Sequence, residues 1–221
     1  MSKVLVIAPH PDDETLGCGG TLFRHKANGN EIYWLIVTGI SVDTGWSNDV
    51  VTKRDNEIDL VEKKYSFADV FNFRLPTTKI DTLPISQLVQ KISDVYKKIE
   101  PEIIYMPFAH DVHTDHQLIA KALQSTLKWF RNPSIKKVLM YETLSETENN
   151  FIQGQSFKPN VFVDISQYLD EKVEAMKIYE SQIGHFPFPR SEKNIRALAT
   201  FRGSQSGFTA AEAFELVYER K

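Results

Sequence analysis

The stretch Val4–Glu14 reads VLVIAPHPDDE, an apolar run that passes directly into a cluster of acids. The near-continuous apolar residues of Val4–Ala8 are typical of a strand buried on both faces of a sheet. The cluster His10–Glu14 then falls where this strand should end and a helix should begin. In an open parallel sheet, ligands bind at that carboxyl edge of the strands. The stretch therefore predicts both a buried first strand and a ligand site at its end.

The rest of the first half alternates between strand-like and helical segments. A stripe of apolar residues at helical spacing predicts a helix over residues 85–99, which Asp81 or Thr82 can cap, and a second helix covers 118–127. The other predicted strands are 32–37, 69–73, 103–106 and 138–141. This order predicts an α/β, Rossmann-like three-layer fold, with a mostly parallel central sheet and helices on both faces.

The regular alternation of strand-like and helical segments ends after about residue 142. Residues 145–158 are polar and predict a long loop, followed by a short strand at 161–164 and an amphipathic helix at 166–180. Thr209–Glu212 has the pattern of a capping box, which predicts that a last helix begins there. We expect one domain over residues 1–221, in which 1–142 form the α/β core and 143–221 complete the fold and the pocket.

Composition narrows the class of protein. The 221 residues carry a formal net charge of -3 and no basic tract longer than two residues, which argues against a nucleic-acid partner. The single cysteine, Cys18, excludes an intramolecular disulfide, and the small residues Gly17–Gly20 around it favour close packing of a helix on the sheet, although a fourth metal ligand is the alternative. No apolar run approaches the roughly 20 residues of a transmembrane segment. The default expectation is a cytoplasmic protein, with a homo-oligomer left open.

The cluster His10–Glu14, considered alone, allows two interpretations. Three acids and an imidazole within His10–Glu14 would repel one another on an inert turn, and a bound divalent cation would turn them into ligands. The alternative is that Asp12 or Asp13 caps the following helix. The cluster by itself leaves these two readings about even.

A second cluster, His110–His116, decides between them. Three of the six histidines fall within these seven residues, after the predicted strand that ends near Met106. His113 and His116 are spaced i, i+3, which directs both imidazoles to one side of a helix start. Zinc favours imidazole together with carboxylate, and a catalytic zinc site takes three protein ligands and leaves one position open. Because both clusters follow strands, we expect them to meet at one sheet edge and to share a metal ion.

At these residues the sequence resembles the PIG-L/LmbE-type zinc N-deacetylases, which act on N-acetylglucosaminyl conjugates. The segments that carry the resemblance span most of the chain: Ala8–Glu14, Arg54–Glu57, His113–His116, Ser181–Gln182, Arg202–Gly203 and Ala211–Phe214. The resemblance implies that His10, Asp13 and His116 bind Zn²⁺, with another divalent metal such as Fe²⁺ as the alternative. It implies a zinc-bound water that Asp12 activates as general base, and a catalytic His113 that Asp115 orients.

The sequence departs from the family pattern at Asp111. In the mycothiol-pathway branch a tyrosine at this position helps to hold the oxyanion, and an ionised acid cannot do so. The oxyanion partner is therefore open. The proline usual within the second motif is Thr114 here.

The substrate expected from this resemblance is a small amino-sugar conjugate that loses its N-acetyl group. Arg54 is a candidate substrate contact, because its planar fork suits phosphate or carboxylate, and the alternative is an ion pair with Asp55 or Glu57. Trp46 is a candidate for stacking on a sugar ring. Two other functions remain open: a different metal-dependent amidohydrolase or phosphoesterase, for which His110 and Asp111 would hold a second metal, and a non-catalytic binding module that a metal stabilises.

Overall fold

A seven-stranded sheet forms the centre of the computed structural model, which describes residues 1–221. The strands lie in the order β3-β2-β1-β4-β5-β7-β6. Their bounds are β1 Lys3–Ala8, β2 Glu31–Gly39, β3 Asp69–Pro76, β4 Ile103–Pro107, β5 Lys137–Tyr141, β6 Val161–Asp164 and β7 Ala211–Glu219. Strands β1 to β5 are parallel, and β7 runs antiparallel to both of its neighbours. The predicted mostly parallel sheet is confirmed.

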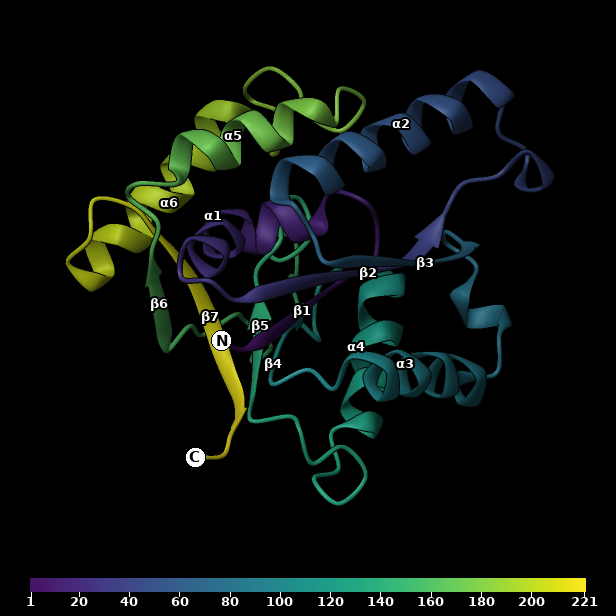
Figure 1. Ribbon diagram of the computed structural model, residues 1–221. Helices are drawn as coiled ribbons and strands as arrows, with labels where there is room; N and C mark the ends of the chain where they lie inside the picture. Colours follow the sequence, from purple (N-terminus) through teal and green to yellow (C-terminus); the bar gives the residue numbers. More distant parts are fainter.

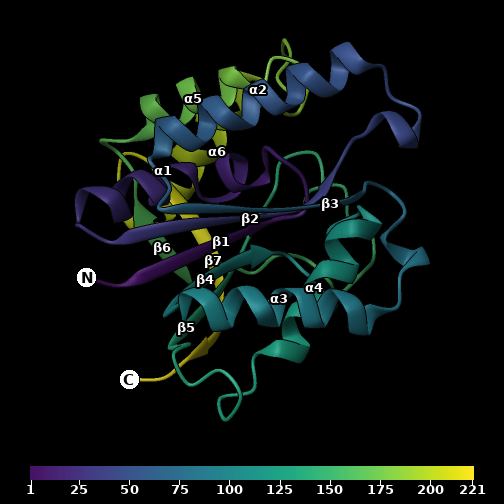
Figure 2. The same ribbon diagram turned by 45° about the vertical axis from the view of Figure 1, so that its right-hand side comes forward.

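Helices cover both faces of this sheet, so that the molecule has three layers (Figures 1 and 2). Helices α1 Asp13–Ala27, α2 Asn48–Tyr65, α5 Leu169–Ile178 and α6 Glu192–Ser206 lie over one face. Helices α3 Ile85–Ile99 and α4 Thr114–Thr126 lie over the other. Two short 3-10 turns, η1 Val42–Thr44 and η2 Ile80–Thr82, complete the elements. The predicted Rossmann-like arrangement is thus confirmed.

Strand β1 shows why an uninterrupted apolar run becomes a central strand. Val4 and Val6 point into the core beneath α1, α2 and α5, whereas Leu5 and Ile7 point into the core beneath α3 and α4. All four side chains are fully buried. Because successive strand residues face opposite layers, both faces of a central strand must be apolar. Burying such side chains stabilises the fold by about 1.5–3 kcal/mol each.

The sheet also places the two chemistry-bearing loops beside each other. Strand β1 pairs with β2 on one side and with β4 on the other, with Val6 opposite Tyr105. The chain order therefore reverses between β1 and β4, which is the topological switch point at which open α/β sheets bind ligands. The loops that follow these two strands carry His10–Glu14 and His110–His116.

Helix α1, which begins at the first of these loops, packs unusually close to the sheet. A Cβ atom on Gly17 would lie 2.2 Å from the ring of Tyr141, and one on Gly20 would lie 2.7 Å from Ile165. Only glycine allows these approaches. The expectation that small residues let this helix pack tightly is confirmed.

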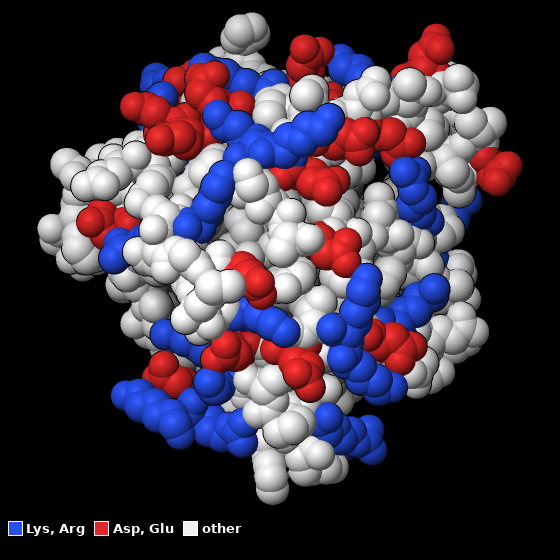
Figure 3. Space-filling view, in the orientation of Figure 1, with Lys and Arg blue, Asp and Glu red and all other residues white.

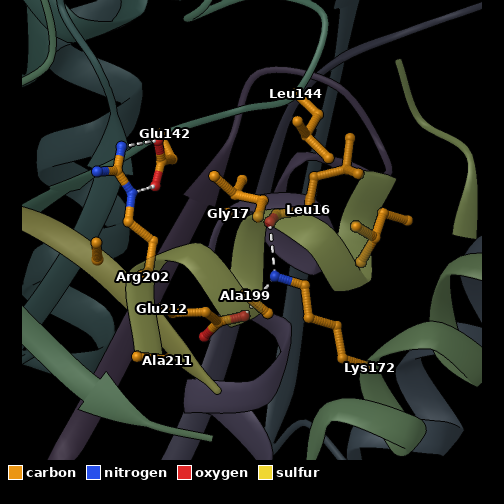
Figure 4. A pocket seen from close by; sticks show the side chains of 12 residues that line it. Leu16, Gly17, Glu142, Leu144, Lys172, Ala199, Arg202, Ala211 and Glu212 are labelled. Carbon is orange, nitrogen blue, oxygen red and sulfur yellow. Dashed lines mark hydrogen bonds and ion pairs between the residues drawn. The ribbon is translucent and has the colours of Figure 1, made fainter. Parts of the chain in front are cut away.

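The same helix is interrupted at Cys18, whose φ and ψ of -145° and 22° are not helical. The interruption frees the N–H groups of Gly20 and Thr21, which donate to the carboxylate of Glu212 at 2.9 and 2.7 Å. It also frees the carbonyl of Leu16, which accepts from Lys172 Nζ at 2.9 Å. Lys172 and Glu212 pair at 2.6 Å, and both are buried. Figure 4 shows this ion pair between α5 and β7, which satisfies the polar groups that the kink exposes.

The predicted last helix after Thr209–Glu212 is wrong. Residues 211–219 form β7, which inserts between β5 and β6. Ala211, Ala213 and Phe214 of this strand are buried, and pairing with two neighbours satisfies its backbone, so tertiary context overrides the local capping pattern. Glu212 does cap helical N–H groups, but they belong to α1. The predicted caps of α3 are also wrong, because Pro84 is its N-cap and Asp81 and Thr82 lie in η2.

The surface is mixed in charge. On the face seen in Figure 3, Lys and Arg are interspersed with Asp and Glu, and no large field of one sign is visible. None of the helices combines the length and the apolar composition that crossing a membrane requires.

The buried ion pair yields a stability prediction. We expect Glu212→Gln to lower the free energy of unfolding by about 3–5 kcal/mol, because it leaves the ammonium group of Lys172 buried without its counter-charge. Urea unfolding followed by circular dichroism measures this loss.

The matched control is Glu180→Gln, which breaks the exposed pair between Lys53 and Glu180. This variant should unfold at nearly the wild-type urea concentration, because solvent screens exposed pairs. If both variants lost the same free energy of unfolding, the stabilising role of the buried pair between Lys172 and Glu212 would be contradicted.

Candidate metal centre and active site

The loop after β1 holds the first cluster in a strained conformation. Asp12 has φ 140° and ψ -26°, values that a residue with a Cβ rarely adopts. Its backbone N–H donates to Glu14 Oε2 at 3.1 Å, and Thr38 donates to the carbonyl of Pro9 from both its N–H and its hydroxyl. The side chain of Asp12 makes no capping hydrogen bond to α1. The strain and the missing cap favour a chemical role for Asp12 over the helix-capping alternative.

Glu14, the last acid of this loop, is fully buried and belongs to its support. Its carboxyl group accepts from Thr15 Oγ1 at 2.6 Å and from the Tyr179 hydroxyl at 2.8 Å, in addition to the N–H of Asp12. Burial raises the pKa of Glu14 to about 8. Glu14 thus fixes the peptide of Asp12 and is shielded from the cleft.

Three donor atoms from the two clusters meet at the switch point. His10 Nδ1 lies 3.3 Å from Asp13 Oδ2 and 3.3 Å from His116 Nε2, and the third distance, His116 Nε2 to Asp13 Oδ2, is 3.2 Å. A tetrahedral ion with bonds of about 2.0–2.1 Å separates its ligand atoms by about 3.3–3.4 Å. The triangle therefore fits a zinc-sized divalent cation with three protein ligands and one open position.

Both imidazoles of this triangle are fixed through their second nitrogen. His116 Nδ1 lies 2.8 Å from Asp111 Oδ2, and His10 Nε2 lies 3.1 Å from Asp115 Oδ2. Asp111 in turn accepts from the hydroxyl of Thr147 at 2.5 Å. Such carboxylate–histidine pairs orient metal ligands and raise their basicity. This pattern also supports a metal at the triangle.

The shifted pKa values of His10, Asp13 and His116 indicate that positive charge is stabilised between these three residues. Burial opposes protonation of His10, but the carboxylates of Asp115 and Asp13 outweigh it and raise the pKa of His10 to about 9. Against the same penalty of burial, Asp13 and Asp111 raise the pKa of His116 well above its usual value. Burial acts to raise the pKa of Asp13, yet the two histidines hold it far below normal. A divalent cation would replace these protons and satisfy all three lone pairs.

Asp12 and His113 flank the triangle. Burial, together with the charge of Asp13, raises the pKa of Asp12 to about 7, while Arg190 opposes this shift. The Nδ1 atom of His113 accepts from the backbone N–H of Asp115 at 3.1 Å, so the proton of the neutral ring lies on Nε2. Burial and the nearby charges of His10 and His116 lower the pKa of His113 to about 4. His113 is therefore held as a neutral hydrogen-bond donor.

The structure places Asp115 differently from the expectation. Its carboxylate, which also accepts from the N–H of Thr78 at 2.8 Å, contacts His10 and not His113. Only its backbone reaches His113. Asp111 occupies the position at which the mycothiol-pathway enzymes have an oxyanion-binding tyrosine, and it was also a candidate ligand of a second metal. In the structure its carboxylate instead contacts Nδ1 of His116.

The arrangement of the second cluster bears on a second metal. Both carboxylate oxygens of Asp111 are engaged by His116 and Thr147, and His110 is exposed against the ring of Phe108. The other group with ligand spacing, His10, His113 and Asp115, shares His10 with the triangle. Cys18 is buried and belongs to neither group. The geometry favours one ion over two.

A cleft of about 740 Å³ opens onto this centre. Its walls include His10, Asp12, Asp13 and His113, together with both expected substrate contacts, Arg54 and Trp46. Trp46 is 43% exposed, so its ring is accessible. Volumes of this size are usual for small-molecule sites.

Arg54 acts as a clamp between segments that are distant in the sequence. Its Nη1 donates to the carbonyl of Pro11 and its Nη2 donates to Ser181 Oγ, both at 2.9 Å. Its Nε lies 3.3 Å from the carboxylate of Glu57, so the alternative of an ion pair is also realised. Arg54 therefore lines the cleft with each of its nitrogens engaged by protein.

The cleft residues that the sequence analysis missed include Glu146 and Arg190. Glu146 comes from the long loop after β5, and Arg190 comes from the turn before α6. Neither lies in a motif with a ligand or catalytic spacing, so no local pattern could have identified them. The fold alone brings them to the cleft.

Comparisons with known proteins identify the family of this chain. The GlcNAc-PI de-N-acetylase (PIG-L) family profile matches residues 5–127, more than half of the chain. A diacetylchitobiose deacetylase from Thermococcus kodakarensis is 28% identical over 98% of this chain and 84% of its own length. The chain therefore belongs to the PIG-L family.

Solved structures share the fold. An N,N'-diacetylchitobiose deacetylase from Pyrococcus horikoshii has a TM-score of 0.79 at 21% identity, over 98% of this chain and 84% of that one. A 4-carboxy-2-hydroxymuconate hydratase from Pseudomonas putida has a TM-score of 0.75 at 19% identity, over 100% and 98% of the two chains. Since one of these is a hydratase, the fold does not by itself determine the reaction.

The support of His116 can be tested by metal binding. We expect Asp111→Asn to weaken zinc affinity by about 10- to 100-fold, because the amide cannot accept the Nδ1 proton as a charged carboxylate does. Competition with a chromophoric chelator measures the affinity. The control is Asp81→Asn, which alters an exposed carboxylate in η2 and should bind zinc like the wild type. An unchanged zinc affinity in Asp111→Asn would contradict the proposed role of Asp111 in orienting His116.

Proposed function

We propose that the protein is a metal-dependent hydrolase that removes the N-acetyl group from an N-acetylglucosamine-type sugar conjugate. The observation that carries this proposal is the triangle of His10, Asp13 and His116, open to a cleft beside the strained Asp12. Membership of the PIG-L family supports this proposal. The similarity to a diacetylchitobiose deacetylase over 98% of the chain supports it as well.

The residues of the triangle would hold Zn²⁺, or another divalent metal such as Fe²⁺. When bound, such an ion lowers the pKa of water to about 7 and polarises a carbonyl oxygen. His10 and His116 contribute neutral imidazoles, whose orientation Asp115 and Asp111 fix.

Asp12 is the general base in this proposal. Its carboxylate lies at the cleft and has one protein partner, Arg190, at 3.3 Å from Oδ2. It takes the proton of the water that attacks the acetamide carbonyl, and this proton can then pass to the departing amine. The C–N bond breaks, and acetate and the free amino sugar leave.

His113 and Asp115 assist this centre. Because Nδ1 of His113 accepts a backbone N–H, its Nε2–H can donate to the oxygen that gains charge as the carbonyl is attacked. His113 thus acts as a neutral donor. Asp115 positions both histidines, His10 through its carboxylate and His113 through its backbone.

The cleft would hold the sugar. We propose that Trp46 offers an exposed ring face to the conjugate and that Arg54 forms the wall near the motif loop. Residues 1–221 act as one domain in this proposal, because the segment 143–221 supplies Glu146, Ser181 and Arg190 to the same cleft.

The role of Asp12 gives the central activity test. The zinc-loaded wild type should release acetate from N,N'-diacetylchitobiose or another N-acetylglucosamine conjugate, and a chelator should abolish this release. Asp12→Asn should be slower by about 10²–10⁴-fold at unchanged zinc content, because the amide cannot take the proton. Enzymatic determination of acetate measures the rate.

The control for this test is Asp43→Asn, an exposed acid in η1, which should keep wild-type activity. If the zinc-loaded wild type released no acetate from any N-acetylated sugar, the proposed function would be wrong. If Asp12→Asn kept full activity, the assignment of the base would be wrong.

A further inference from the structure

Arg190 is held in place by the backbone on both sides of it. Ser191 is the N-cap of α6 and accepts from the N–H of Asn194 at 3.3 Å, and the side chain of Asn194 donates to the carbonyl of Pro189 at 2.8 Å. The guanidinium carbon of Arg190 lies 5.4 Å from the ring centroid of Phe188. Its orientation toward the cleft is thus built into the turn.

The four cationic side chains that line the cleft differ in what they already bind. Arg54 donates from Nη1 and Nη2 to protein acceptors and forms an ion pair with Glu57. Lys53 pairs with Glu180 at 2.7 Å, and Arg74 pairs with Asp55 at 2.9 Å. Arg190 has one hydrogen-bond partner in the protein, the Oδ2 atom of Asp12 at 3.3 Å. Donors of Arg190 therefore remain available at the reacting end of the cleft.

One of these donors is buried. The Nε atom of Arg190 is shielded from solvent and has no hydrogen-bond partner, although the residue lines the cleft. The side chain as a whole is 22% exposed, and its Nη2 atom has no protein acceptor, so Nη2 is the donor that the cleft can reach. A ligand group that pairs with Nη2 must be an acceptor, because a guanidinium has five N–H donors and no lone pair to offer.

We propose that Arg190 is a substrate-contacting residue, which donates from Nη2 to an oxygen of the N-acetylated sugar unit while Nη1 holds Asp12. This inference rests on the proposed deacetylase function. It assigns to Arg190, and not to Arg54, the free guanidinium of the site. The acceptor is an oxygen next to the scissile amide, since Arg190 contacts the general base itself. A planar guanidinium suits such a bridge between two acceptors.

The test compares Arg190→Met with Arg190→Lys, using acetate release from N,N'-diacetylchitobiose. We expect kcat/KM to fall about 10- to 100-fold in Arg190→Met, the effect of losing one charge-assisted hydrogen bond. Arg190→Lys keeps the charge but lacks the planar fork of Nη1 and Nη2 that can bridge Asp12 and the substrate, so it should recover little of the loss. A loss confined to kcat assigns the contact to the acyl oxygen in the transition state, and a rise in KM assigns it to a hydroxyl bound throughout.

The control is Lys193→Met, an exposed cation over Phe186 in the same segment, which should leave kcat and KM unchanged. Zinc content and melting temperature are measured for every variant. Added guanidinium ion should partly restore the activity of Arg190→Ala, a rescue that a purely structural role would not show.

Two results would overturn the inference and leave the deacetylase function standing: wild-type kinetic constants in a zinc-loaded Arg190→Met, or a loss that guanidinium does not rescue and that follows a loss of zinc or of thermal stability. An inactive wild type would overturn the proposed function, and this inference with it. If Arg190→Met does not fold, Arg190→Lys carries the same comparison, and unchanged constants there contradict the need for a guanidinium fork.

Discussion

The structure depends on one electrostatic constraint, the carboxylate of Asp13 enclosed between the imidazoles of His10 and His116. Three lone-pair donors within 3.2–3.3 Å of one another cannot stay buried without positive charge among them. Protons or a divalent cation can supply that charge. The spacing of the three atoms matches that expected between three ligands of a tetrahedral cation.

Much of the surrounding structure serves to keep this arrangement rigid. The strained peptide of Asp12 is anchored by Glu14, whose buried carboxyl group is itself bonded to Tyr179. The interrupted helix that follows would leave buried polar groups unpaired, and the ion pair of Lys172 with Glu212 satisfies them. Strain at the centre is thus balanced by polar contacts that reach α5 and β7, far away in the sequence.

The fold of this protein does not by itself specify which reaction it catalyses. Its architecture is shared with a deacetylase and with a hydratase, so the three layers define only where a ligand binds. The proposed reaction follows from the residues at the switch point: a triangle for one metal, a carboxylate poised as base, and a histidine locked as a neutral donor. In the proposal Arg190 extends this set toward the substrate, because Asp12 is the only hydrogen-bond partner of its guanidinium.

The sequence by itself determined six of the seven strands, the mostly parallel sheet and the two clusters. Apolar runs such as Val4–Ala8 and the density of histidines in His110–His116 are local signals, and parallel strands bring the loops at their carboxyl ends to one edge of the sheet. Only the tertiary structure decided that residues 211–219 form a strand, that Asp115 supports His10, that Asp111 supports His116, and that Arg190 reaches the cleft. These outcomes depend on contacts between residues far apart in the chain, and such contacts leave no periodicity or spacing in the sequence from which they can be predicted.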